Sequence, residues 1–505
     1  MLGDKWITDR TPTEKFPHYT RANGADVLAD PVTPLGWTWS WESGVVLGCR
    51  DGFVSYGVFD ADEYGDPPES FGLFGGYFYN CLTQARMMGV RQPGATPEMV
   101  DDAYFDAHPD VPPYVAEEWH ESEVHSQRLE KNAEYLLGTD SHPPIEELKV
   151  LAQELRDSRP DLTSLSLSEL VARAREMQYP TRQIFDQHVM ASLAASNGPA
   201  ILTGILAEVG READVVKLVT GIGNVDSAEI GRELWNLSRL IRNSETMSAH
   251  FDEASPNIDT DHLTDEFNDS LEVFLHRHGS RGPNEWDPGS DTYESNLSLT
   301  FSQLDLIRKQ DDSADPLLAF ERNALERERL RAEFEEMFAE NEEASGMFSV
   351  GMKAGELWMA LRERNKCSAV KPIHEVRMCF NEIADRMVVE GHLDNRKQIY
   401  MLLEEEVDGF ISDPASYTDL LREREADYKL LFDLDPPFIV NTVCPPLSEW
   451  PKKSDLSYSP VAVGEIMQGN ACSPGTYTGK ARVILDASDP SALEPGEILV
   501  TFNTD

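Results

Sequence analysis

The sequence predicts a mainly α-helical protein with a small β-containing N-terminal part and a strand-rich C-terminal segment. Three observations lead to this fold class. From position 114 onward, apolar residues recur with helical period over most of the chain. Before about position 113 the chain is rich in glycine, proline and aromatic residues, and beyond a proline-rich stretch at 436–460 the apolar pattern becomes strand-like. We therefore expect an α+β part at 1–113, a large helical domain at 114–455 and the start of an α/β domain at 456–505.

The elements of the N-terminal part are expected to be mostly strands. Residues 45–47 and 53–59 have strand-like composition, and a Cys-Arg-Asp-Gly turn signal lies between them. Residues 71–79 form a further apolar stretch that contains glycine. Trp37, Trp39 and Trp41 alternate along the chain, so an extended backbone would place all three rings on one face.

Periodicity and end signals locate the helices that follow. Pro144 suits the first turn of a helix, the sequence Ser-Leu-Ser-Glu at 166–169 has capping-box character, and Gly391 suits the residue after a helix C-cap. Opposite charges three and four residues apart at 316–341 are typical of a long exposed helix, and glycines at 346–355 predict an interruption after it. The expected helices are 115–137, 144–158, 166–178, 181–195, 200–209, 228–243, 264–278, 316–341, 371–391, 402–411 and 416–431, with a loop at 279–297.

The proline-rich stretch at 436–460 lacks helical period and is interpreted as a linker. Beyond it, 462–467, 476–484 and 497–502 are predicted strands, with glycine-containing turns at 469–475 and 495–496. This last part has only about forty-five residues, which is too few for an ordinary stable α/β domain, so we expect it to be incomplete.

Composition excludes several classes of partner. The 505 residues carry 90 acidic against 44 basic side chains, a formal net charge of -46, and such a surface repels nucleic acid and anionic lipid. Because the acidity is spread along the chain, we interpret it as a solvated surface. The six cysteines form no CxxC pair and no zinc-type cluster with histidine, so no metal site is predicted. Residues 1–20 lack the apolar core of a signal peptide and no run of eighteen apolar residues occurs, so a cytoplasmic protein is expected.

Two blocks near the C-terminus carry the most specific signal, GNACSPGTYTGKARVI at 469–484 and LEPGEILVT at 493–501, followed by Thr504-Asp505. In order and spacing they resemble the opening of the phosphohistidine swivelling domain of phosphoenolpyruvate-utilising enzymes, which include phosphoenolpyruvate synthases, rifampin phosphotransferases and phenylphosphate synthases. A generic β-hairpin fits the two blocks less well. In those relatives a Thr-His setting with the catalytic histidine follows. No Thr-His dipeptide occurs in this chain, so that role is assigned to no residue.

The sequence FLHRHGSRGPNEWD at 274–287 resembles the motif of the helical substrate domain of rifampin phosphotransferase-like proteins, where Tyr-Gly-x-Arg-Gly-Pro-x-Glu follows a helix. Arg281 could clamp phosphoryl oxygens in a bidentate manner. Glu285, Asp287 or His278 could accept a hydroxyl proton or orient the residue that does. The alternative is an Arg281–Glu285 ion pair that only fixes the loop, and both can hold together. A tyrosine is usual at the position of His278, which leaves the role of this histidine open.

A third block, at 362–406, resembles the helical stretch that precedes the swivelling domain in the same relatives. At helical spacing Lys366, Glu363, His374 and Arg377 could share a face across neighbouring turns. We expect Lys366 and Arg377 to meet an incoming phosphohistidine, and His374 to contact substrate. The alternative for any one of them is an ordinary charged helical surface.

The N-terminal block resembles the start of the phosphoenolpyruvate synthase-like substrate domain through Asp30-Pro31 and Thr33-Pro34-Leu35, and through the stretch at 74–80 with Arg86 after it. This resemblance makes Asn80 and Arg86 candidate substrate-binding residues. The tryptophans at positions 37, 39 and 41 could line an apolar acceptor pocket. The alternative for each of them is packing in the core.

The resemblance implies a phosphotransferase component that moves phosphate from ATP, through a mobile phosphohistidine, to a hydroxyl of a small hydrophobic phenol or alcohol. The chain has no P-loop and no ATP-grasp sequence, so ATP and Mg²⁺ are expected on a separate ATP-grasp subunit. This organisation is similar to the separate subunits of phenylphosphate and cresol-phosphate synthases. Without the histidine segment and that partner the chain is expected to be inactive. Two alternatives stay open: a non-catalytic ligand-binding or regulatory subunit, and further chemistry on the alcohol after its phosphorylation.

Overall fold

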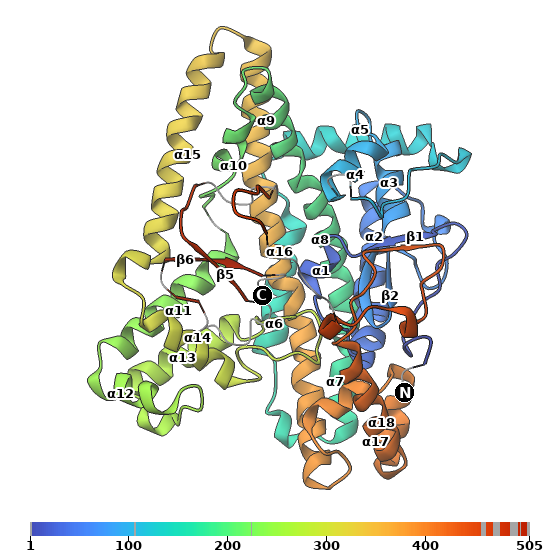
Figure 1. Ribbon diagram of the computed structural model, residues 1–505, viewed down its shortest axis with the longest axis vertical. Helices are drawn as coiled ribbons and strands as arrows, with labels where there is room; N and C mark the ends of the chain where they lie inside the picture. The colour runs from blue at the N-terminus through green and yellow to red at the C-terminus, as the bar shows by residue number, and fades with distance from the viewer. Residues whose placement is uncertain are drawn as a thin grey trace.

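The computed structural model describes residues 3–105, 108–223, 225–455, 461–467, 475–484, 493–494 and 496–501. Over these residues the fold is mainly α-helical, with small sheets only, which confirms the predicted fold class. Figure 1 shows a long helical body, with the N-terminal part along one side of it.

Helix α16 (Glu342–Val389) is the central element and runs along the length of the body (Figure 1). It packs against α6 (Pro143–Asp157), α8 (Gln178–Ala195) and α9 (Asn197–Ala207). Because neighbours surround it, large side chains such as Trp358 are completely buried along its length. The sequence predicted only the second half of this helix, at 371–391.

The glycines at 346–355 do not interrupt α16, so that prediction was wrong. Gly351 and Gly355 face Gly198 of α9, and a Cβ on Gly198 would lie 2.3 Å from the Gly355 nitrogen. Glycine here allows two helices to approach closely, and the packing that follows outweighs the low helix propensity of glycine.

The N-terminal part contains a four-stranded antiparallel sheet of order β2-β3-β1-β4. A hairpin of β2 (Phe71–Phe74) and β3 (Tyr77–Cys81) pairs with β1 (His18–Thr20), and β1 pairs with β4 (Ile439–Asn441). The glycine pair between β2 and β3 has positive φ angles of 59° and 76°, as tight hairpin turns require. The stretch at 436–460 is therefore more than the predicted linker, because its β4 strand completes this sheet.

The predicted strands at 45–47 and 53–59 are wrong, because both stretches are helical. A π-helix, η1 (Gly36–Val46), continues directly into α2 (Leu47–Tyr56). Gly44, Gly48 and Gly52 recur every four residues and face α8, and a Cβ at any of them would come within 2.9 Å of that helix. Gly52, which suggested a turn, thus belongs with Gly44 and Gly48 to the flat face of a closely packed helix pair.

The predicted helices agree in position with helices of the structure, and α1, α3, α4, α10, α12 and α14 fall where none was predicted. In Figure 1, α11 to α14 form a separate lobe beside α6, with its own apolar core. The remaining α-helices are α1 (Gly24–Val27), α3 (Leu82–Arg91), α4 (Pro97–Phe105), α5 (Glu123–Gly138), α7 (Leu167–Glu176), α10 (Val215–Leu218), α11 (Asp226–Arg242), α12 (Glu245–Ala254), α13 (Asp265–His278), α14 (Leu297–Arg308), α15 (Pro316–Phe338), α17 (Val407–Ser412) and α18 (Thr418–Leu431).

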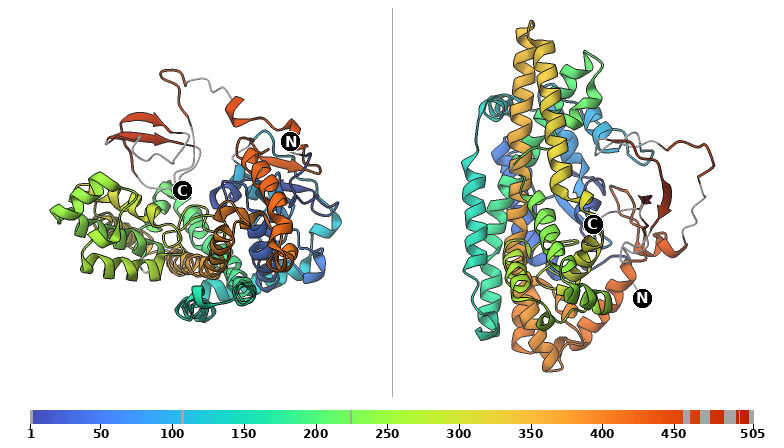
Figure 2. Two further views of the ribbon diagram at one scale, coloured as in Figure 1. Left: turned by 90° about the horizontal axis from the view of Figure 1, so that it is seen from below. Right: turned by 90° about the vertical axis from the view of Figure 1, so that its left-hand side faces the viewer.

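Near the C-terminus, β5 (Lys480–Val483) and β6 (Glu497–Val500) pair in parallel, which confirms strands at both predicted places. Figure 2 shows this pair beside the helical body. The predicted strand at 462–467 is wrong, because no strand forms at 461–467. Most of the turn at 469–475, Pro495 of the second turn, and Thr504-Asp505 lie outside the described residues.

Within the described part of the chain, one helical stretch, Leu167–Ala207, is long and apolar enough to cross a membrane by length and composition. Its mean hydropathy reaches 1.4, and half of that window is buried against the rest of the protein. Core helices of globular proteins pass the same test, and α8 within this stretch packs between α2 and α16.

Candidate functional site

The loop after α13 contains the Arg281 motif and is fixed by an ion pair. The Arg281 Nε atom donates to a Glu285 carboxylate oxygen at 2.6 Å, and the Gly282 N–H donates to the same oxygen at 3.1 Å. Arg281 also donates to the Cys367 sulfur of α16 at 3.0 Å. Burial acts to lower the pKa of Arg281, but Glu285 and Cys367 have the larger opposite effect. The net pKa is raised, so the guanidinium stays charged. The predicted Arg281–Glu285 ion pair is therefore present, and Arg281 also reaches α16 through Cys367.

Lys366 and Arg362 lie one turn apart on α16, and Lys366 precedes Cys367 in the chain. Lys366 has no ion pair or hydrogen bond with any described residue, and Arg362 has only a 3.7 Å contact with its neighbour Glu363. Burial, with the charges of Arg362 and Lys366, lowers the pKa of His188 to about 3. His188 is therefore neutral near pH 7, and both cations act on it across the space between α16 and α8.

His188 of α8 packs 6.0 Å from the ring of Trp286, which belongs to the Arg281 loop. These contacts join α8, α16 and the loop at one place. We call the group of Arg281, Arg362, Lys366, His188 and Trp286 the basic face. It contains three basic side chains, of which Arg281 pairs with Glu285 and Arg362 lies 3.7 Å from Glu363, in a chain where acidic side chains outnumber basic ones by 90 to 44. Such a group favours phosphate and other multivalent anions.

Arg377 and His374 do not belong to the basic face, although both were predicted to share it with Lys366. Arg377 is buried and donates to the backbone carbonyls of Glu285, Asp287 and Ser290 at 2.8, 3.0 and 2.8 Å. It also lies 2.9 Å from His374 Nδ1. Burial lowers the pKa of Arg377. Its geometry is that of an anchor which holds the Arg281 loop from inside.

His374 is buried beside Arg377, and its Nε2 atom lies 2.6 Å from a Glu294 carboxylate oxygen. Burial lowers the pKa of His374 to about 4, although the bond with Glu294 raises it. Burial also acts to raise the pKa of Glu294, but the contacts with His374, Arg159 and Arg156 outweigh it and hold that pKa well below its usual range. The predicted contact of His374 with substrate stays a prediction.

Asp287 and His278 also point away from the basic face. Asp287 is buried and accepts from the Thr33 N–H, the Thr33 hydroxyl and the Gly289 N–H at 2.6 to 2.8 Å. Burial raises the pKa of Asp287, and these hydrogen bonds oppose the change. His278 faces α11, with its Nε2 atom 3.4 Å from Glu233, and burial lowers its pKa. Of the predicted catalytic residues, the structure brings together Arg281, Glu285 and Lys366.

The tryptophans at 37, 39 and 41 do not line one face, because their segment is helical. Trp37 stacks on Trp41 at 5.8 Å, whereas Trp39 packs at 4.9 Å against Phe380 in another part of the core. Trp41 donates to the backbone carbonyl of Trp286 at 2.9 Å, and so supports the Arg281 loop. All three are buried, as the packing alternative expected.

The two remaining predicted substrate-binding residues have structural partners. Asn80 donates to the Ala22 carbonyl at 3.0 Å. Arg86 is buried and holds both oxygens of Asp101, at 2.8 and 2.7 Å, so it joins α3 to α4. Neither side chain borders a cavity described below, and their roles in binding stay predictions.

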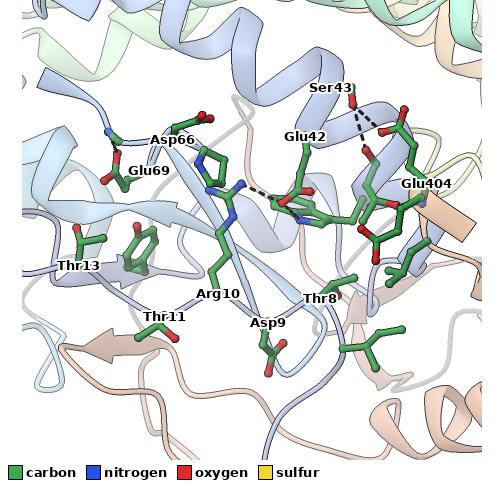
Figure 3. Close-up of a pocket in the computed structure, with 18 residues that line it drawn as sticks. Thr8, Asp9, Arg10, Thr11, Thr13, Glu42, Ser43, Asp66, Glu69 and Glu404 are labelled. Atoms are coloured by element: carbon green, nitrogen blue, oxygen red, sulfur yellow. Dashed lines mark hydrogen bonds and ion pairs between the residues drawn. The ribbon is translucent and has the colours of Figure 1, made fainter. Parts of the chain in front are cut away.

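The largest cavity, of about 820 Å³, lies on the N-terminal part and is shown in Figure 3. Arg10 crosses it and donates to Glu42 at 3.0 Å, and Trp37 donates to the same oxygen at 2.9 Å. Trp37 in its wall stacks on Trp41, which packs in turn against Trp286 of the basic face. The carboxylates of this cavity would repel a phosphorylated group. They belong to Asp9, Glu42, Asp66, Glu69, Glu404 and Glu405.

A second cavity, of about 310 Å³, lies against the Arg281 loop on the side of Asp287. Asn284 borders it with a positive φ of 49° and donates to Asp30 at 2.9 Å. Its walls include the rings of Tyr400, Tyr428 and Phe432. A cavity of this size and apolar character suits a small aromatic or aliphatic ligand.

Sequence reasoning missed three members of the basic face. Arg362 precedes Lys366 by four residues, so its position on the same helix face could have been derived from helical spacing. Trp286 lies inside the recognised motif. His188 gave no signal, because only the packing of α8 against the Arg281 loop brings it to this place.

Part of the chain is similar to known phosphotransferases. Residues 187–363 match the family model of the fourth domain of rifampicin phosphotransferase, a stretch that includes all of the basic face except Lys366. The chain is 24% identical to rifampicin phosphotransferase from a Streptomyces species over 349 residues, which are 64% of this chain and 39% of that protein. Uncharacterised proteins of Mycobacterium tuberculosis and Mycobacterium bovis are 27% identical over 144 residues, 28% of this chain and 16% of theirs.

The chain thus matches well under half of the length of these relatives. The matched family domain covers α9 to α15, the second half of α8 and the first part of α16, which together carry the Arg281 loop, His188 and Arg362. Domain match, helical fold and sequence motif agree. Through residues 187–363 the chain is thus related to the rifampicin phosphotransferases, which are phosphoenolpyruvate-utilising-type enzymes, and the similarity to one of them extends over 349 residues at 24% identity.

Proposed function

We propose that this chain binds the acceptor in a phosphotransferase that moves phosphate from ATP, through a mobile phosphohistidine, to a hydroxyl of a small hydrophobic phenol or alcohol. The observation that carries the proposal is the basic face. Lys366 and Arg362 project from one helix beside Arg281, and Lys366 has no partner among the described residues.

The chemistry asked of this face is mainly positioning and charge neutralisation. In the transfer, the N–P bond of the phosphohistidine breaks, an O–P ester bond forms, and the hydroxyl proton leaves with the imidazole. Charge spreads over the phosphoryl oxygens in the transition state, and nearby cations stabilise it. Arg281 is pre-oriented by Glu285 and Cys367, so it loses little freedom on binding.

The acceptor is proposed to occupy the cavity of about 310 Å³ beside the Arg281 loop. Its tyrosine and phenylalanine rings would cover an apolar body, while Asn284 and Lys397 at its border would orient a hydroxyl. The Arg281 loop separates this cavity from the basic face and contributes to both, so a small movement of the loop would bring a bound hydroxyl to the phosphoryl group.

ATP and Mg²⁺ are proposed to bind an ATP-grasp partner subunit or domain that phosphorylates the mobile histidine. This division of acceptor binding and nucleotide binding between separate folds is similar to that of phenylphosphate synthase. We place neither nucleotide nor magnesium on the described residues of this chain.

The test uses the intact phosphotransferase that contains this region, with its ATP-grasp component, ATP and Mg²⁺. Formation of the phosphohistidine and of the phosphoester is measured separately over a panel of phenols and aliphatic alcohols. Lys366→Met and Arg281→Ala should leave phosphohistidine formation unchanged and lower transfer to the acceptor at least about a hundredfold. Lys353→Met is the matched control, because Lys353 lies on the same helix and pairs with the exposed Asp140.

Transfer at the wild-type rate in both variants would exclude the basic face as the transfer site. Phosphorylation of the histidine without transfer to any acceptor would favour the ligand-binding or regulatory alternative.

A further inference from the structure

A separate polar cluster lies on the N-terminal part, away from the basic face. Asp60 and Glu63 form the capping box around the short helix η2 (Ala61–Glu63), and His125 lies in the first turn of α5. The His125 Nε2 atom is 3.3 Å from an Asp60 carboxylate oxygen and 3.5 Å from a Glu63 carboxylate oxygen. The three ligand atoms all lie within 4.8 Å of one another.

His125 is unusual because its inner nitrogen lacks a hydrogen-bond partner. Only 5% of the residue is exposed, and Nε2 is buried without a hydrogen bond. Its other ring nitrogen, Nδ1, lies 2.7 Å from the hydroxyl of Ser122, the N-cap of α5. When Nδ1 donates to this hydroxyl, Nε2 directs a lone pair at the two carboxylates. A lone pair and two carboxylates repel one another unless a cation lies between them.

We propose that Asp60, Glu63 and His125 bind a divalent transition-metal ion, with Zn²⁺ as the best fit. Metal–ligand bonds of about 2.1 Å in a tetrahedral site place neighbouring ligand atoms about 3.4 Å apart. The two distances from His125 Nε2 are 3.3 and 3.5 Å. One imidazole nitrogen and two carboxylate oxygens suit a first-row transition metal better than Mg²⁺ or Ca²⁺, which prefer oxygen ligands alone.

The surroundings of the cluster resemble an outer shell around a metal site. Arg91 is buried and holds Glu63 at 2.6 and 2.9 Å, and the Asp60 N–H donates to Glu63 at 2.8 Å. Ligating carboxylates are commonly oriented by such bonds, as ligating histidines are by a bond like that of Ser122. The Glu63 oxygen that faces His125 accepts both the Asp60 N–H and one Arg91 N–H, so a bound ion would share this oriented oxygen with two donors.

Arg128 is the cation that pairs with Asp60. It pairs with the Asp60 oxygen that does not face His125, at 2.6 Å. Both side chains are nearly half exposed, at 45% and 46%, so this pair is weak and Arg128 can turn into solvent. The same exposure of Asp60 leaves an entry path and room for a water ligand. The competing explanation is an ion-pair cluster in which His125 is protonated and no metal binds.

A bound ion would join η2 to α5 through residues that are more than sixty positions apart in the chain. Binding to the folded state alone raises the melting temperature in proportion to the logarithm of ion concentration. The experiment therefore measures Zn²⁺ affinity by competition with a chromophoric chelator, and melting temperature with and without Zn²⁺. Excess Ca²⁺ is present to occupy the many surface carboxylates. The absorption spectrum of the Co²⁺-substituted protein reports the ligand set.

The wild-type chain should bind one Zn²⁺ that Ca²⁺ does not displace. His125→Gln and Asp60→Asn should each weaken binding by more than about tenfold and abolish the shift in melting temperature. Asn is a good N-cap residue, so Asp60→Asn preserves the helical turn and decides the matter if His125→Gln fails to fold. His262→Gln is the control, because His262 lies 3.2 Å from Asp259 on the surface, and it should bind Zn²⁺ as the wild type does.

Equal Zn²⁺ affinity in the wild type and both cluster variants would overturn the proposal and leave an ion-pair cluster only. The proposal would also be overturned if excess Ca²⁺ displaced all of the Zn²⁺ that the wild-type chain binds.

Discussion

Thr33 and Asp287 are 254 positions apart in the chain, and both donors of Thr33 bind the Asp287 carboxylate. The Thr33 N–H and hydroxyl reach its two oxygens at 2.7 and 2.6 Å. Asp287 is buried, so these bonds are shielded from water. They fasten the N-terminal part directly to the loop that carries Arg281, and the position of Arg281 therefore depends on a contact distant in sequence.

Removal of the Asp287 carboxylate should destabilise the fold. Asp287→Ala would leave two donors of Thr33 and the Gly289 N–H unsatisfied, and each buried unsatisfied group costs about 1–3 kcal/mol. We expect a loss of about 3 kcal/mol or more in the free energy of unfolding, measured by urea denaturation. Thr33→Val should cost less, and the double variant should show coupling. Asp385→Ala, which breaks an exposed pair with Arg396, serves as the control.

Asp9 should make stability depend on pH. Burial raises its pKa to about 6 from 3.8, although backbone N–H groups lower it. Because the folded state then holds the proton more tightly, this contribution is complete below about pH 3.8 and is lost as pH rises through about 6. At about 1.4 kcal/mol per pK unit, the change is about 3 kcal/mol at most.

Asp9→Asn removes this titration. Its free energy of unfolding relative to the wild type should therefore rise between about pH 4 and 6 and stay constant above that range. Asp66→Asn, an exposed carboxyl in the same cavity, controls for the loss of one charge. A constant difference between Asp9→Asn and the wild type across this range would contradict the prediction.

Two glycines of α9 should respond to alanine in opposite directions. A Cβ on Gly198 would lie 2.3 Å from the Gly355 nitrogen, whereas Gly204 has nothing within 4 Å. We expect Gly198→Ala to cost about 1–3 kcal/mol through overpacking, and Gly204→Ala to add about 0.5–1 kcal/mol through helix propensity. Thermal and urea unfolding measure both, and equal effects would show that α9 and α16 adjust freely.

Arg377→Lys should loosen the Arg281 loop. The guanidinium donates hydrogen bonds to the carbonyl oxygens of Glu285, Asp287 and Ser290. A lysine ammonium cannot reproduce this fixed planar geometry. We expect a loss of about 2–4 kcal/mol in stability. Faster hydrogen exchange of backbone amides at 285–290 should accompany it. Arg331→Lys, an exposed residue paired with Glu335 on α15, should change neither measurement.

Local sequence predicted the fold where local interactions decide it. Ser166 and Glu169 form the expected capping box at the start of α7. Local signals failed where distant packing decides. Gly52 of α2 suggested a turn, and Gly351 and Gly355 of α16 suggested an interruption. All three lie against another helix, which no single stretch of sequence reveals. The pairing of β4 with β1 is equally invisible, because their registers meet only after more than four hundred residues of chain.

The candidate site divides in the same way. The motif at 274–287 gave an Arg281–Glu285 ion pair as one alternative, and the pair is present because both groups lie in one short loop. Helical spacing could not separate Lys366, which is partly exposed, from Arg377, which is completely buried, since both lie on one helix. Which face of α16 is covered depends on α8 and on the loop at 279–296, and their positions follow from the whole fold.

The β4 strand also protects the sheet. It covers the outer edge of β1, and beyond it the buried side chains of Leu447 and Trp450 and the bonds between Ser454 and Asp433 keep the chain fastened to the rest of the fold. An unpaired sheet edge is a template for pairing with another chain. A truncation before β4 would therefore expose the N–H and C=O groups of β1 and favour aggregation.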